Sequence, residues 1–264
     1  MKAAFFAVFL AAGIVLFPAI AEETTIIQIP AGEIFSGIKV DATGTNAGII
    51  VIPAGPGETA VLRMRNLKGG MRFSDGTMIV EVQSTQTIAR RIFGFGIGNR
   101  QEITLRLPSG SLDSVDLETL NGGIRLENMN FTEGTLSTSN GGILFENTKF
   151  SRAAMVTNNG GIRLIDTDWD TLDASTSNGS VNISGAKAGE GSTSIRTSNG
   201  SVYLGILGNE DDFSYTIGAF NGSIRVNGER MRGHNNMFDS GTGAHRIRIQ
   251  TSNGRANLEF EKEF

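Results

Sequence analysis

The sequence has 264 residues, of which 39% are hydrophobic, 35 are glycine, five are proline and none is cysteine. This apolar content is enough for a large core and excludes intrinsic disorder, while the lack of cysteine excludes thiolate metal sites, disulfide scaffolds and lipid attachment through an amino-terminal cysteine. The near balance of 23 basic and 27 acidic residues argues against a nucleic-acid partner, and two histidines leave little for a histidine-rich metal centre or a serine-histidine-aspartate triad.

The first segment of the chain is typical of a secretory signal peptide. Lys2 carries a positive charge, residues 3–17 are an apolar run, and small residues stand at positions 19 and 21, which predicts a signal peptide over residues 1–21 with cleavage after Ala21. An uncleaved anchor is disfavoured because 15 apolar residues fall short of the roughly 20 that span a bilayer. We expect an exported mature chain in the periplasm, at the cell surface or in the medium, with no transmembrane segment.

Residues 22–110 are strand-like but irregular. Their runs alternate or are continuously apolar, with glycine-rich or Asp-Gly breaks between them, at residues 25–29, 48–52, 60–64, 78–82 and 103–107. No linker-like composition separates this region from residues 111–264. We therefore predict one domain over residues 22–264.

The same region is locally basic, with Arg63, Arg65 and Arg72 among its cations. Outward positions on a strand explain the alternation of Arg63 and Arg65 without any ligand. The functional alternative is a patch that binds an anionic glycan or a lipid headgroup.

A repeat dominates the rest of the chain, in which the pair Asn-Gly recurs at separations of 19, 19, 19, 21, 22 and 32 residues. The third and fifth residues after each Asn are mostly apolar and the residue between them is mostly polar, the alternation of a strand with one buried face. A second strand leads into each pair. Asn and Gly both tolerate the left-handed backbone, so each pair is expected to make a sharp bend. The seven pairs are Asn121-Gly122, Asn140-Gly141, Asn159-Gly160, Asn178-Gly179, Asn199-Gly200, Asn221-Gly222 and Asn253-Gly254.

The constant spacing favours a parallel β-solenoid over an antiparallel meander or sandwich, because identical positions of successive coils would then stack at the strand spacing of about 4.8 Å. We predict an all-β, single-chain parallel β-helix with coils of about 19–22 residues and Asn-Gly corners, irregular over residues 22–110 and regular over residues 111–264. Phe131, Phe150 and Trp169 each follow an Asn by ten residues. These aromatics are expected to fill the far edge of the coil.

The densest acidic group is Asp166, Asp168, Asp170 and Asp173, beside Trp169. Such a group could bind Ca²⁺ or supply an acid/base pair. A solvated turn is the preferred interpretation, because only one coil carries the group.

An insertion lengthens the last interval of the repeat near residues 229–243, and we expect it to loop out of the coil. It contains Arg230, Arg232 and His234. Long excursions on a rigid scaffold often carry binding surfaces, so these residues are candidates for contact with a partner.

The element Ile103–Pro108 (ITLRLP), followed by residues 109–123 and by units of the form T-S-N-G-[GS]-[IV]-x-[LIF], resembles the bacterial "putative adhesin" family. The resemblance covers roughly residues 35–264. It implies a parallel β-solenoid in an exported or envelope-associated protein of largely unknown function, with a binding or structural role and no catalytic residues to transfer. Many members have Asp-Gly or Ser-Gly at the corner where this chain has Asn-Gly.

We therefore expect a non-catalytic, adhesin-like or scaffolding protein of the bacterial cell envelope that binds a glycan or a surface protein, without a metal or cofactor. Two alternatives stay open. One is a polysaccharide-active β-helix enzyme, which would need paired carboxylates on one outer face. The other is a structural solenoid that forms homo-oligomers through the unpaired strand edges at its ends.

Overall fold

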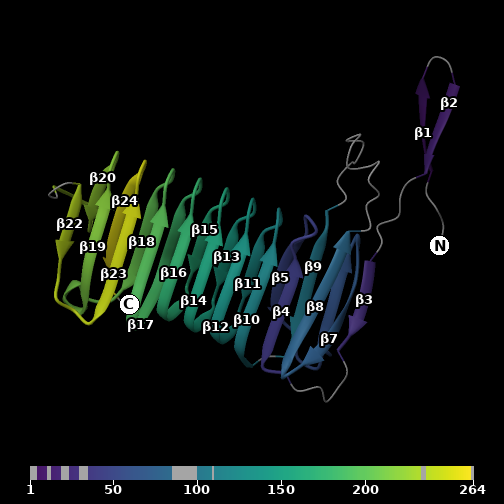
Figure 1. Ribbon diagram of the computed structural model, residues 1–264, viewed down its shortest axis with the longest axis horizontal. Helices are drawn as coiled ribbons and strands as arrows, with labels where there is room; N and C mark the ends of the chain where they lie inside the picture. Colours follow the sequence, from purple (N-terminus) through teal and green to yellow (C-terminus); the bar gives the residue numbers. More distant parts are fainter. Residues whose placement is uncertain are drawn as a thin grey trace.

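The computed structural model of the chain describes residues 5–10, 13–18, 24–29, 35–84, 100–108, 110–232 and 236–262. Within these residues every element is a β-strand, apart from one 3-10 turn, η1 (Glu210–Asp212), and no helix is long and apolar enough to cross a membrane. Strands β1 (Phe5–Leu10) and β2 (Gly13–Pro18) pair antiparallel in a two-stranded sheet of their own. The remaining strands form one long stack (Figure 1).

Each regular coil of the stack contains a nine-residue strand and a four-residue strand. The long strands are β10 (Ser111–Thr119), β12 (Asn130–Thr138), β14 (Lys149–Thr157) and β16 (Asp168–Thr176). The short strands are β11 (Ile124–Glu127), β13 (Ile143–Glu146) and β15 (Ile162–Ile165). Like strands pair parallel from coil to coil, which gives a long-strand sheet and a short-strand sheet, and β17 (Val181–Thr197) runs through both.

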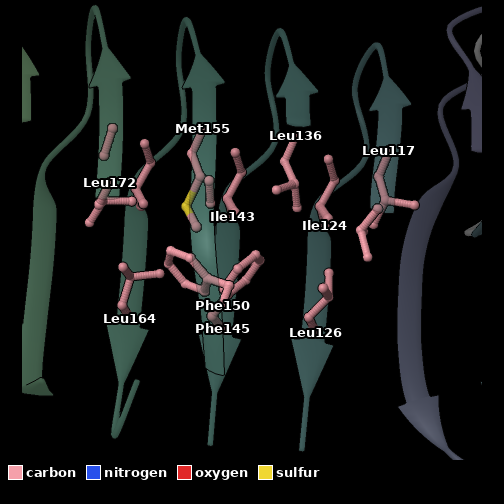
Figure 2. Packing of buried hydrophobic residues seen from close by; sticks show 14 of the residues in the cluster. Leu117, Ile124, Leu126, Leu136, Ile143, Phe145, Phe150, Met155, Leu164 and Leu172 are labelled. Atoms are coloured by element: carbon pink, nitrogen blue, oxygen red, sulfur yellow. The ribbon is translucent and has the colours of Figure 1, made fainter. Parts of the chain in front are cut away.

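The register between neighbouring coils follows the repeat of the sequence. Leu117 pairs with Leu136, Leu136 with Met155, and Met155 with Ala174. These side chains point inward and are fully buried, together with those of the short strands opposite (Figure 2). The all-β, solenoid-like prediction is therefore confirmed, and the core lies between the two sheets.

Aromatic side chains fill one end of this core, as expected from their spacing. The rings of Phe131 and Phe150 stack with centroids 5.2 Å apart, and those of Phe150 and Trp169 stack at 6.1 Å. Phe145 packs edge-on against Phe131 and Phe150 from the short-strand sheet. All four side chains are buried.

The expected left-handed bend at Asn-Gly is wrong, because none of these Asn or Gly residues has a positive φ. The glycine serves close approach instead. A Cβ on Gly141 would lie 1.8 Å from the carbonyl oxygen of Gly122 in the coil below, and the other six corner glycines meet backbone at 1.7–2.0 Å. The left-handed residues stand at the opposite corner, where Asn128, Asn147 and Asp166 have φ of 53°, 48° and 48°.

The coils at the carboxyl end do not stack in chain order. The strands are β18 (Val202–Leu207), β19 (Phe213–Ala219), β20 (Ser223–Val226), β23 (His245–Thr251) and β24 (Arg255–Glu261). Strand β23 lies between β17 and β19, and β24 lies between β18 and β20 (Figure 1). The last coil of the sequence is therefore an inner coil, and the coil that precedes it is the outermost.

The insertion near residues 229–243 leaves the coil as two paired strands. It supplies β21 (Glu229–Met231) and β22 (Met237–Ser240), which pair antiparallel with β20 and β19. The segment thus places antiparallel strands on the outermost coil.

The amino end has a similar arrangement. Strands β4 (Gly37–Ala42) and β5 (Gly48–Pro53) lie between β10 and β11 on one side and β8 (Thr77–Ser84) and β9 (Glu102–Leu107) on the other. The antiparallel strands at this end are β3 (Thr24–Gln28), β6 (Val61–Arg65) and β7 (Leu67–Ser74). Pairing is therefore parallel through the middle of the stack and antiparallel at its two ends.

Candidate functional site

An asparagine ladder runs along the corner edge of the stack. Seven side-chain amides each donate a hydrogen bond to the side-chain carbonyl oxygen of the next asparagine, with N···O distances of 2.5–2.9 Å, and Asn46 at the end accepts the last of these bonds. In stacking order the members are Asn46, Asn121, Asn140, Asn159, Asn178, Asn199, Asn253 and Asn221. A carboxamide has two N–H donors and two carbonyl lone pairs, so each interior member keeps one of each for solvent or a ligand.

The sequence repeat identified seven of these eight asparagines. It missed Asn46, which is followed by alanine instead of glycine. The ordering of Asn253 before Asn221 depends on the inner position of the last coil, which a repeat spacing does not reveal.

Buried threonines on the core side of the ladder donate hydrogen bonds to the backbone of the corner glycines. The Oγ1 of Thr138 donates to the carbonyl oxygen of Gly122 at 2.9 Å, and Thr157 makes the same bond to Gly141 at 2.8 Å. Both threonines are buried. Each corner is thus fixed to the previous coil by a hydrogen bond that water does not reach.

Two open hollows flank the ladder. On the long-strand side is the serine hollow, with a volume of about 350 Å³, defined here by Asn158, Ser177, Ser198, Ser252, Gln250 and Phe220. On the short-strand side is the glycine hollow, with a volume of about 460 Å³, defined here by Gly123, Gly142, Gly161, Arg125, Leu144 and Arg163. Both hollows cross several coils, so a ligand in either would lie across the strands.

The charges beside the glycine hollow are partly neutralised. Arg125 makes a close ion pair with Glu127, and its Nη2 lies 3.9 Å from Glu146. Its guanidinium is about half exposed, so water screens both contacts. At the positions of Gly123, Gly142 and Gly161 the backbone does not require glycine as strictly as it does at the corner glycines. Ser180 and Ser201 occupy the equivalent positions in later coils.

The predicted basic residues of the amino-terminal region do not gather in one patch. Arg63 and Arg65 lie on β6 in the short-strand sheet, whereas Arg72 lies on β7 in the long-strand sheet. Arg63 lines a hollow of about 680 Å³ with Arg106 and other residues. Arg72 pairs with Glu81 at 3.2 Å.

The candidates of the insertion lie at the other end of the stack. Arg230 is on β21 and Arg232 directly follows that strand, and both side chains are exposed. They are separated from Arg63 by all the coils between the two ends (Figure 1). His234 lies outside the described residues.

The acidic group is spread along the start of β16. Asp166 occupies a left-handed corner, Asp168 lies 4.0 Å from the ammonium of Lys149, and Asp173 pairs with Arg196 at 3.1 Å. Asp170 is exposed. In the part of the chain that the structure describes, no three His, Cys, Asp or Glu side chains are placed to share a metal ion.

A buried polar chain was not foreseen from the sequence. The indole N–H of Trp169 donates to Oγ1 of Thr193 at 2.8 Å, and Thr193 lies 2.9 Å from Nε2 of His245. Nδ1 of His245 lies 2.7 Å from the carbonyl oxygen of Gly189, which can only accept, so Nδ1 carries the proton and Nε2 accepts from Thr193. Burial lowers the pKa of His245, against the opposing effects of Gly189 and Asp170.

A second unforeseen cluster lies on the outer face of the short-strand sheet. The hydroxyl of Tyr203 lies 3.1 Å from a carboxylate oxygen of Glu259 and 3.4 Å from one of Glu261. Desolvation, followed by the hydrogen bond and charge of Glu259, raises the pKa of Tyr203 to about 12. The phenol therefore stays protonated and can donate to only one carboxylate at a time.

Comparison with known proteins gives one family match. The family model described as "Toastrack DUF4097" matches residues 59–143 and 113–259. No curated protein matches the chain.

Several solved structures are similar at low identity. A "putative adhesin" from Bacteroides fragilis is 12% identical, covers 90% of this chain and 97% of its own, and has a TM-score of 0.45. A "putative cell adhesion protein" from Clostridium sporogenes is 12% identical, with coverages of 91% and 100% and a TM-score of 0.36. A "putative lipid binding protein" from Parabacteroides distasonis is 12% identical, with coverages of 92% and 97% and a TM-score of 0.39.

Proposed function

This chain belongs to the Toastrack DUF4097 family, and from that premise we propose that it is an exported, non-catalytic protein of the bacterial cell envelope that binds a glycan or a surface protein. Its role is adhesin-like or scaffolding. The architecture we propose for this role is a parallel β-solenoid with Asn-Gly corners, over a mature domain of residues 22–264.

The observation that carries the proposal is the asparagine ladder with a hollow on each side. Eight identical amides stand at the fixed spacing of neighbouring strands, about 4.8 Å, along an edge that is open to solvent. A regular array of donors and acceptors suits a ligand that is itself a repeating polymer. The hollows of about 350 and 460 Å³ beside the ladder are large enough for parts of such a ligand.

The strand topology is compatible with removal of the leader. Strands β1 and β2 pair only with each other, and β3 begins at Thr24, after the expected cleavage site at Ala21. Cleavage there would remove no strand of the main stack.

The test of export uses the full chain with a carboxyl-terminal tag, expressed in a bacterial host. We expect the tagged protein in the envelope or periplasmic fraction, with an intact mass that begins at residue 22. The variant Ala19→Arg, Ala21→Arg should keep the leader, whereas Ala3→Ser should be processed normally. A wild-type chain that keeps its leader and stays in the cytoplasm would contradict the proposal.

The test of binding incubates the exported protein with washed envelope fragments and follows its cosedimentation. We expect retention that saturates with protein concentration and is competed by soluble envelope polymer. Equal sedimentation with and without the fragments would contradict an envelope-binding role.

A polysaccharide-active enzyme is the second candidate, and the Tyr203 cluster is the observation that favours it. Glu259 and Glu261 both contact one phenol, so their carboxylates are close together on one outer face. Release of new reducing ends from a polysaccharide, abolished in Glu259→Gln, would support this candidate over a non-catalytic role.

A further inference from the structure

Phe220 has an unusual place for a large aromatic side chain. It follows β19 in the outermost coil and is 55% exposed, although its backbone N–H is fixed to the carbonyl oxygen of Thr251 at 3.1 Å. Among the described residues its ring takes part in none of the aromatic pairs that fill the core. Folding of the core therefore does not explain why a phenyl ring stands at this position.

From Phe220, a row of small polar side chains runs across four neighbouring coils. The row consists of Ser252, Ser198, Ser177 and Asn158, each on the residue before a ladder asparagine. Within the described part of the chain, these side chains make no hydrogen bond to the protein. Three hydroxyls and one carboxamide, spaced about 4.8 Å apart, are thus free to donate to and accept from a ligand.

The serine hollow has no unpaired charge among the described residues that line it. Arg196 is the one charged side chain among the described residues that line it, and its Nη1 is paired with Asp173 at 3.1 Å. An anionic ligand would find no unpaired cation there, and an apolar partner would leave the hydroxyl row without hydrogen bonds. The chemistry that fits is a neutral ligand that is rich in hydroxyl groups and also has apolar C–H faces.

We propose that the serine hollow binds a neutral glycan, which lies across the coils with one sugar ring packed on Phe220 and its hydroxyls bonded to the row from Ser252 to Asn158. The inference rests on the proposed function, because it names the ligand class and the surface of an envelope-binding protein. The serine hollow is distinct from the basic and acidic residues that the sequence singled out as binding candidates, since none of them lines it.

The full chain is expressed with its leader and purified in the form that the host produces. Its binding to each probe is then measured by calorimetry. The neutral probes are cellohexaose, mannohexaose and chitohexaose, and the anionic probe is hexagalacturonate. We expect at least one neutral probe to bind and hexagalacturonate not to bind. In Phe220→Ala the affinity for the neutral probe should fall about tenfold or more, because the variant removes the apolar anchor.

Matched controls come from the same row of side chains. Leu120 is 42% exposed at the equivalent position of another coil and does not line the hollow, so Leu120→Ala should leave affinity unchanged. Likewise Ser198→Asp, which changes a residue that lines the hollow, should weaken binding, whereas Ser139→Asp, outside it, should not. All four variants should keep the wild-type circular dichroism spectrum, since each changes a side chain at the surface.

The inference is overturned if no neutral probe binds, if only hexagalacturonate binds, or if Phe220→Ala and Leu120→Ala have the same effect. Self-association that Phe220→Ala abolishes, with no binding of a neutral probe, would also overturn it and assign the surface to a second copy of the chain. A protein that is exported and retained on envelope fragments but fails these tests refutes the glycan site alone. A protein that binds a neutral probe but is never exported refutes the proposed function alone.

Discussion

Nε2 of His245 lies 2.9 Å from Oγ1 of Thr193, and both side chains are buried although they come from segments 52 residues apart. The bond exists because the last coil of the sequence is placed directly against β17. Burial favours the neutral imidazole, in which Nδ1 donates to Gly189 and Nε2 accepts the hydroxyl proton of Thr193.

The first prediction concerns acid stability. Because burial lowers the pKa of His245 below 6.5, the unfolded chain takes up this proton first as the pH falls. The contribution of His245 to stability is therefore complete above about pH 6.5 and is lost as the pH falls through the lowered pKa. In thermal unfolding between pH 7.5 and pH 4.5, His245→Gln should lose less stability than the wild type. His234→Gln is the control, and an identical pH dependence of wild type and His245→Gln would contradict the prediction.

The second prediction separates the two glycines of one corner. In Gly141→Ala the new Cβ would lie 1.8 Å from the carbonyl oxygen of Gly122, and the stacked backbones must move apart. We expect a loss of about 3 kcal/mol or more in the free energy of unfolding by urea. Gly142→Ala meets its nearest atom at 3.2 Å and should cost less than about 1 kcal/mol. Equal losses in the two variants would show that close approach is not the reason for the first glycine.

The third prediction concerns the asparagine ladder. Asn140 donates to Asn121 at 2.5 Å and accepts from Asn159 at 2.6 Å, so Asn140→Ala removes two exposed hydrogen bonds and should cost about 1 to 2 kcal/mol. Asn140→Asp should cost more at pH 7, because an ionised carboxylate oxygen would face the Oδ1 of Asn121 with no proton between the two acceptors and repel it. This extra loss should diminish below about pH 4, where an aspartic acid becomes protonated. Chemical denaturation at pH 7 and pH 3.5 measures both effects, and a pH-independent difference between Asp and Ala would refute the ladder geometry.

The fourth prediction concerns the order of the coils. Deletion of residues 245–264 removes the inner coil that joins β19 and β20 to the stack. We expect limited proteolysis to cut this variant within residues 209–244, while a chain that ends at residue 208 resists cleavage. Resistance of residues 209–244 in the first variant would mean that the outer coil can pair directly with β17 and β18.

Periodicity predicted the repeat well because the physical cause is local to each coil. The alternation of apolar and polar residues around Asn140 is repeated around Asn159, and these residues occupy equivalent places in the stack. The reason why glycine follows each asparagine could not be predicted from the sequence in the same way. The sequence permits a left-handed bend at Gly141, and only the distance to Gly122 in the neighbouring coil shows that close approach decides the residue.

The candidate site was less predictable, because nearness along the chain is not nearness in the stack. Arg65 and Arg72 are seven residues apart in the sequence, yet they lie in different sheets. Conversely, Phe220 and Ser177 line the same hollow although 43 residues separate them, because the intervening coils stack side by side. The order of the last two coils cannot be derived from the repeat, because every coil has strands that could pair with those of any other coil.

The inner position of residues 245–261 also sets a time order for folding. During synthesis, the coil of residues 213–226 leaves the ribosome before the segment that must lie between it and the rest of the stack. Its strands can pair with the stack only after residues 245–261 are available, and β23 then bridges β17 and β19, which are far from each other in sequence. The outer coil therefore cannot join the stack in its native order until residues 245–261 have emerged from the ribosome.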